Sequence, residues 1–169
     1  MEKLLAKLSS YNLFNYLLPG IIFSILLEKI TNYSIIHKDI MIEAFLAYFI
    51  GLIISRISSL VVEPILQKIK FVKFSEYKDF LLASERDKKI ELLSELNNMY
   101  RVFISLFFIL ITIVLYEKFL QDIFVGYTNY IATIGLLILF LFSYRKQTSY
   151  ITKRIEIFKN KQKEESTNE

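Results

Sequence analysis

Residues 40–62 read IMIEAFLAYFIGLIISRISSLVV, a run of 23 residues whose only charges are Glu43 and Arg56. A helix rises about 1.5 Å per residue, so this run is longer than the hydrocarbon core of a bilayer, which is about 30 Å thick. Its apolar residues surround the helix, whereas a helix on the surface of a water-soluble domain has one apolar stripe. The run therefore predicts a helix that crosses a membrane.

Three more runs of this kind occur in the 169-residue chain, and none of them contains a charge: residues 13–27, 102–116 and 127–144. With their flanking residues, the four spans are expected at about 11–30, 40–62, 100–120 and 127–144. Hydrocarbon offers the backbone no hydrogen-bonding partner, so each span must be a helix. The alternative, a soluble protein with four buried helices, would leave too little polar surface. The expected fold is all-α, a polytopic membrane protein with four transmembrane helices.

Lysine and arginine are distributed unevenly between the two sides that four spans define. The segment before the first span, the segment from Arg56 to Arg101 and the segment after the fourth span hold 18 of the 21 basic residues. Because basic loops stay in the cytoplasm, both termini are expected there. Lys3 and Lys7 before the first run would also suit a signal peptide, but residues 28–32 (EKITN) offer no cleavage site, so a retained span is expected.

This topology divides the chain into four parts: a first transmembrane hairpin (1–62), a short helical cytoplasmic insert (63–98), a second hairpin (99–146) and a cytoplasmic tail (147–169). The last ten residues of the tail are polar and are expected to be disordered. The lipid bilayer is the first partner that the sequence implies.

The insert has the features of a small helical unit. Residues 68–74 alternate basic and apolar side chains, which suits either an anionic membrane surface or a plain connector. Ser75 and Ser84 are candidate helix caps, and one helix is expected over residues 85–115. A run of mixed charge begins this helix and is either a solvated face or a docking surface for a cytoplasmic protein partner: Arg86, Lys88, Lys89, Glu91 and Glu95.

Small residues recur every four positions in the second span: Ala47, Gly51, Ser55 and Ser59. They share one helix face, and a face of small residues lets another helix approach closely in lipid. The partner is either another span of the same chain or a second copy. A chain with four spans has little internal core, so the pattern favours a homo-oligomer.

Polar residues inside the spans are candidates for a conduction path: Asn15, Glu43 and Arg56. Charges at membrane depth are costly and often functional, although both charged residues are close enough to a span end to reach the headgroups. Glu63, seven residues after Arg56, is a candidate partner for it. Pro19 and Gly20 interrupt the first span and predict a kink, which is either a hinge, a re-entrant bend or a static packing feature.

The sequence lacks the residues that common catalytic sites require. The chain has no Cys, a single His (His37) and four Gly, which excludes the usual metal sites, His-based triads and glycine-rich phosphate loops. No cofactor is expected, and we expect no enzyme activity. The net charge is only +4, and acidic residues are interspersed with the basic ones. A nucleic-acid partner is therefore not expected either.

Residues 11–20 read YNLFNYLLPG, and this stretch resembles the opening of small multi-span bacterial membrane proteins of phage-defence loci. The resemblance implies a multi-pass protein of a bacterial inner membrane, a non-enzymatic sensor or effector of anti-phage defence that acts through oligomerisation or membrane perturbation. Two alternatives remain open: a small ion channel or transporter subunit, and a membrane anchor for a cytoplasmic enzyme.

Overall fold

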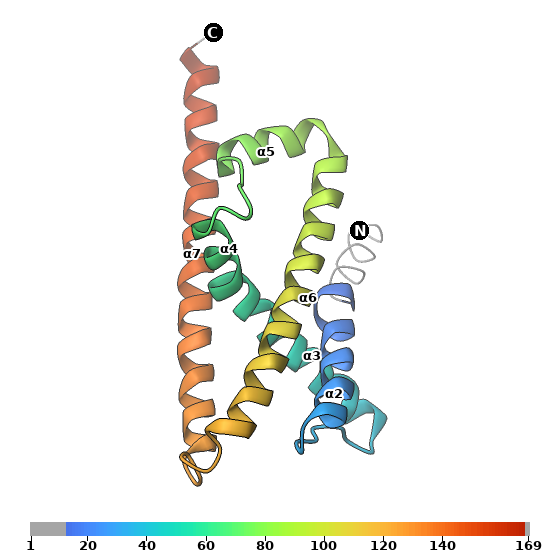
Figure 1. The fold of residues 1–169 in the computed structure, drawn as a ribbon. Helices are drawn as coiled ribbons and strands as arrows, with labels where there is room; N and C mark the ends of the chain where they lie inside the picture. Colours follow the sequence, from blue (N-terminus) through green and yellow to red (C-terminus); the bar gives the residue numbers. More distant parts are fainter. Residues whose placement is uncertain (1–12, 168–169) are drawn as a thin grey trace.

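The computed structural model describes residues 13–167, and its secondary structure is entirely helical (Figure 1). The elements are η1 (Leu13–Leu17), α2 (Leu18–Ile30), α3 (Ile40–Ile57), η2 (Ser58–Val62), α4 (Glu63–Lys68), α5 (Tyr77–Arg86), α6 (Lys88–Phe119) and α7 (Thr128–Thr167), where η marks a π-helical turn. The all-α prediction is therefore confirmed for this part of the chain.

Four helical stretches are long and apolar enough to cross a membrane: Leu13–Ile30, Ile40–Lys68, Lys88–Phe119 and Thr128–Gln162. They contain the four spans that the sequence predicts, except for Tyr11, Asn12, Leu120 and Tyr127. Tyr11 and Asn12 lie outside the described residues, as do residues 168–169 of the tail. Leu120 follows the last residue of α6.

Aspartate side chains start two of the long helices. The side chain of Asp39 accepts hydrogen bonds from the backbone N–H of Met41 (2.8 Å) and of Ile42 (3.2 Å) at the start of α3. The side chain of Asp87 accepts one from the backbone N–H of Lys89 (2.9 Å) at the start of α6. Each carboxylate satisfies N–H groups that have no partner within the helix and favourably meets the positive end of its dipole.

Three local predictions are wrong. Ser75 does not cap a helix, because α5 begins at Tyr77 after Glu76 and no side chain caps it. Residues 85–115 are not one helix, because α5 ends at Arg86, Asp87 is extended, and α6 begins at Lys88. Ser84 lies inside α5 and donates its hydroxyl to the carbonyl of Leu81 (2.9 Å), while Asp87 is the cap. Of the last ten residues, which were expected to be disordered, those as far as Thr167 belong to α7.

The packed core belongs to α2, α3 and α6. Its buried residues are Phe23, Leu27, Ile54, Val102, Leu106 and Leu110. α7 lies beside this core and extends well past it, and α5 crosses from α7 to α6 at that end (Figure 1). We call this end the α5 end; the opposite end holds the connections 31–39 and 120–127.

Candidate functional site

A group of charged and hydroxyl side chains joins three helices toward the α5 end. We call this group the Glu63 cluster: Ser58, Ser59, Glu63, Arg101 and Lys146. One carboxylate oxygen of Glu63 pairs with Nη1 of Arg101, and the other lies 3.3 Å from Nζ of Lys146. Only 13% of the Glu63 side chain is exposed, so the carboxylate is largely removed from water. A single acidic group therefore links α4 to both α6 and α7.

The π-helical turn η2 supplies the remaining bonds of the cluster. The backbone N–H of Glu63 bonds to the carbonyl of Ser58, five residues earlier. In the same register the carbonyl of Ser59 faces Pro64, which has no N–H to donate. Nζ of Lys146 donates to this carbonyl (2.7 Å) and to the Ser59 hydroxyl (2.8 Å). The proline thus explains why a lysine from a distant helix binds at this point.

Positive charge exceeds negative charge around Glu63. Arg101 also donates from Nε to the hydroxyl of Ser58 (3.0 Å), which fixes the plane of its guanidinium group. The charges of Arg101 and Arg56 both act on Lys146. One carboxylate therefore serves two bound cations. Removing the carboxylate would leave these cations facing one another in a poorly solvated place.

The first two candidate spans cross at direct backbone contact. A Cβ added to Gly20 would overlap the carbonyl of Ala47, and one added to Gly51 would overlap the carbonyl of Tyr16. Gly20, Ala47 and Gly51 are all buried. Ala47 and Gly51 therefore pack against another span of the same chain, which was one of the two kinds of partner expected for this face. The pattern of small residues therefore does not require a second copy.

The other two members of the small-residue face lie nearer the α5 end. Ser55 is half-buried, and Ser59 belongs to the Glu63 cluster. Pro19 is buried in the first turn of α2, directly after the π-helical turn η1. The wider π turn is the local adjustment that accompanies the proline, and the crossing with α3 covers it.

The candidate conduction residues are in separate environments. Asn15 is buried in η1, with 3% of its surface exposed. The carboxylate of Glu43 accepts a hydrogen bond from the backbone N–H of His37 (2.7 Å) in the 31–39 connection. Arg56 is 13 positions further along one helix, about 20 Å away at 1.5 Å per residue. The structure does not bring Glu43 and Arg56 together, and within the described residues Glu63 forms ion pairs with Arg101 and Lys146 rather than with Arg56.

The candidate docking residues surround the bend between α5 and α6. Arg86 is the last residue of α5, and the others lie in the first two turns of α6: Lys88, Lys89, Glu91 and Glu95. Arg86, Lys88, Lys89 and Glu91 are exposed, and Glu95 is half-buried. The structure therefore places these charges on one accessible corner of the molecule.

Sequence reasoning missed three members of the Glu63 cluster: Ser58, Arg101 and Lys146. A signal for them was present, because Pro64 removes a backbone donor and Arg101 and Lys146 each border a long apolar run. Comparison with known proteins adds no further assignment, since no protein-family model fits the sequence and no curated protein or solved structure matches it.

Proposed function

We propose that this chain is a non-enzymatic component of the bacterial inner membrane that acts as a sensor or effector, by association of copies along α7 or by perturbing the bilayer. The exposure of α7 carries the proposal. Only 6% of its most apolar stretch is buried, against 33% for Leu13–Ile30, 28% for Ile40–Lys68 and 22% for Lys88–Phe119. A helix of membrane length that is so little buried by its own chain can contact lipid or another copy over most of its surface.

α7 also connects the two ends of the molecule without a break. Near the tail, Nζ of Lys161 lies 3.0 Å from the carboxylate of Glu85 in α5. The rings of Tyr77 and Tyr150 also meet, with centroids 5.7 Å apart. A partner that binds to α5 therefore has a continuous helix through which to change the position of the fourth candidate span.

We propose four membrane crossings, with the α5 end and both termini in the cytoplasm. The excess of lysine and arginine at that end supports this orientation. Reporter fusions within α5 and within the 120–127 connection test it. We expect a cytoplasmic signal from α5 and an external signal from 120–127, and the opposite pair of signals would overturn the topology.

Cysteine cross-linking tests the association of copies, since the chain contains no Cys of its own. Leu137 on α7 is 61% exposed and Phe108 on α6 is 49% exposed. We expect Leu137→Cys to form disulfide-linked dimers in membranes, while Phe108→Cys, the matched control, stays monomeric. Equal cross-linking at both positions would indicate random collision and contradict association along α7.

Substitutions that change the shape of the exposed α7 surface test whether this surface is needed for function. The substitutions Ile134→Ala, Leu137→Ala and Leu141→Ala trim one exposed surface and leave it apolar. We expect the wild-type chain to depolarise cells in a membrane-potential dye assay, and this triple variant to lose the effect. The control trims three exposed α6 residues: Phe107→Ala, Phe108→Ala and Ile111→Ala. No depolarisation by the wild-type chain, or equal losses in both variants, would count against the proposal.

Phage defence is the setting that the resemblance of residues 11–20 implies. We expect cells that express the chain to reduce phage plating, and the α7 triple variant to restore it. Normal phage plating on cells that express the wild-type chain would contradict a role in defence. The dye assay would still test the membrane proposal.

A membrane anchor for a cytoplasmic protein is the second candidate, and one observation favours it. Leu92 and Leu93 near the start of α6 are 58% and 62% exposed, beside the charged corner at Arg86 and Lys88. Replacing residues 75–98 with a flexible linker tests this candidate. Co-purification of a soluble protein that is lost in the linker variant would support it, and unchanged recovery would exclude it.

A further inference from the structure

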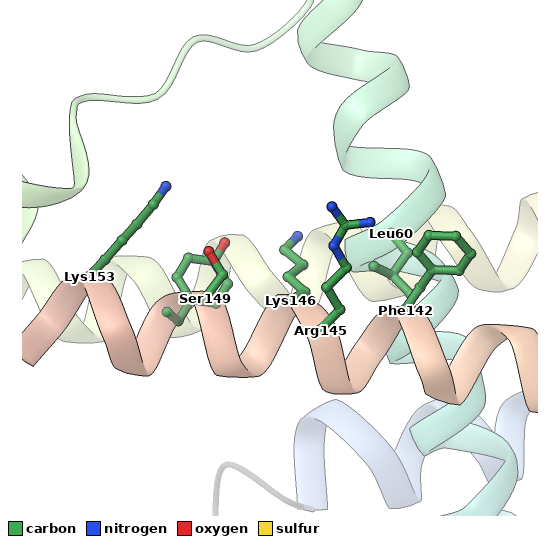
Figure 2. A pocket seen from close by; sticks show the side chains of 7 residues that line it. Leu60, Phe142, Arg145, Lys146, Ser149 and Lys153 are labelled. Atoms are coloured by element: carbon green, nitrogen blue, oxygen red, sulfur yellow. The ribbon is translucent and has the colours of Figure 1, made fainter.

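A pocket of about 350 Å³ lies between η2 and α7, beside the Glu63 cluster (Figure 2). Phe142, Arg145, Ser149 and Lys153 line it from α7. They follow one another at three or four positions, which places them on one face of the helix. Figure 2 shows the side chains of Phe142, Arg145 and Lys153 leaving the same side of α7. We propose that this pocket binds the phosphate group of an anionic phospholipid.

The charges around the pocket suit an anion. Arg145, Lys146 and Lys153 line it, and no carboxylate is among its lining residues. Nζ of Lys146 has three N–H groups, and it already has three acceptors: the carbonyl and the hydroxyl of Ser59 and the carboxylate of Glu63. Lys146 therefore supplies positive charge to the pocket but has no hydrogen bond left to give.

Arg145 and Lys153 are the groups available to bind the ligand. Within the described part of the chain, neither of them makes a hydrogen bond or an ion pair. The hydroxyl of Ser149 lies between them along the helix. A guanidinium and an ammonium on one helix face, with a hydroxyl between them, are the donors that hold phosphate oxygens in proteins.

The order of residues along the pocket distinguishes a lipid from a free anion. Phe142 and Leu60 are apolar, and Phe142 belongs to the apolar run 127–144. Arg145, Ser149 and Lys153 follow immediately beyond this run. A phospholipid has the same order, with acyl chains in the hydrocarbon and a phosphate at its border. This inference rests on α7 crossing the bilayer, and not on association of copies or on any cellular response.

Native mass spectrometry of the full chain in detergent tests the proposal, with phosphatidylglycerol as the anionic probe and phosphatidylcholine as the zwitterionic one. We expect Arg145→Gln with Lys153→Gln to weaken phosphatidylglycerol binding by about tenfold, since two charge-assisted contacts are lost. Arg154→Gln with Lys159→Gln is the matched control, because it removes an arginine and a lysine from α7 outside the pocket. Equal losses in the two double variants would overturn the proposal.

Two further arms distinguish the possible sources of the phosphate. We expect Phe142→Ala to weaken phosphatidylglycerol binding and to leave the weak binding of glycerol phosphate unchanged. Glycerol phosphate binding as tightly as the lipid would overturn the lipid assignment, as would equal binding of the two lipids. Should the double variant fail to fold, Ser149→Glu puts a carboxylate at an exposed position in the pocket. We expect it to abolish lipid binding, and retained binding would overturn the proposal.

Discussion

The first and the fourth candidate spans are attached to α3 in opposite ways. η1 and α2 meet α3 backbone to backbone at Gly20 and Gly51, with no room for a side chain. α7 meets α3 and the helical turns that continue it through the Glu63 cluster and through the rings of Phe49 and Phe140, whose centroids are 6.3 Å apart. Close contact of this kind depends on shape along the whole crossing. A helix held at a few polar and aromatic points can shift without loss of the core.

The largest expected effect is at the close crossing. Gly51→Ala places a Cβ on the carbonyl of Tyr16, and a backbone cannot move away as a flexible side chain can. We expect the free energy of unfolding to fall by about 3 kcal/mol, the upper range for overpacking, and Gly51→Leu to prevent folding. Thermal unfolding in detergent, followed by circular dichroism, measures the loss.

Gly135 in α7 is the matched control for this prediction. A Cβ added there has no atom within 4 Å, so Gly135→Ala relieves the entropic cost of a helical glycine without a clash. We expect this variant to be more stable by about 0.5–1 kcal/mol. A loss at Gly135, or no loss at Gly51, would remove the contrast between the two helices. Gly51→Leu cannot test the association of copies, because it disrupts packing within the chain itself.

The next largest effect is at the carboxylate of Glu63. Glu63→Gln leaves Arg101 and Lys146 without their shared anion, and α7 loses its ion pair with α4. We expect a loss of about 2–3 kcal/mol, below the value for a fully buried pair because part of the site is exposed. Thermal unfolding of Glu156→Gln, the same charge change at an exposed position on α7, is the control. Similar values for both variants would show that the cluster does not hold α7.

Much of this architecture follows from the apolar runs alone. Each run contains enough consecutive apolar residues to require a helix of membrane length, and Pro19 and Pro64 both lie in first helical turns as their missing N–H requires. The small residues Ala47 and Gly51 also indicated a close helix contact. What they could not give was the partner, because a small face accepts any helix of matching shape.

The bonds between distant helices could not be predicted in the same way. Ser59 and Lys146 are 87 positions apart, and their contact depends on a π-helical turn that no local pattern announces. The boundary at Asp87 was missed for a different reason. Ser84 and Asp87 are both acceptable caps, and the choice depends on where α5 ends.

A smaller effect is expected where aromatic rings join α7 to α3. Phe49 and Phe140 are nearly parallel, with an angle of 22° between their planes. Such a pair contributes about 0.5–1.5 kcal/mol beyond its buried area, and lipid can replace the contact only in part. A double-mutant cycle with Phe49→Ala and Phe140→Ala isolates this coupling energy. A coupling energy near zero would leave the Glu63 cluster as the main link between α7 and α3.

The smallest effect is expected at the far end of α7, where Lys161 pairs with Glu85 of α5. The two side chains are 47% and 62% exposed, so water screens the attraction between them. Both side chains also keep much of their conformational freedom, and little is lost when the pair breaks. We expect Glu85→Gln to change the free energy of unfolding by less than about 0.5 kcal/mol. If unfolding in detergent instead showed a loss as large as that of Glu63→Gln, α7 would be fixed at both ends. The helix would then be as rigidly placed as α2, and the freedom that the proposed response requires would be absent.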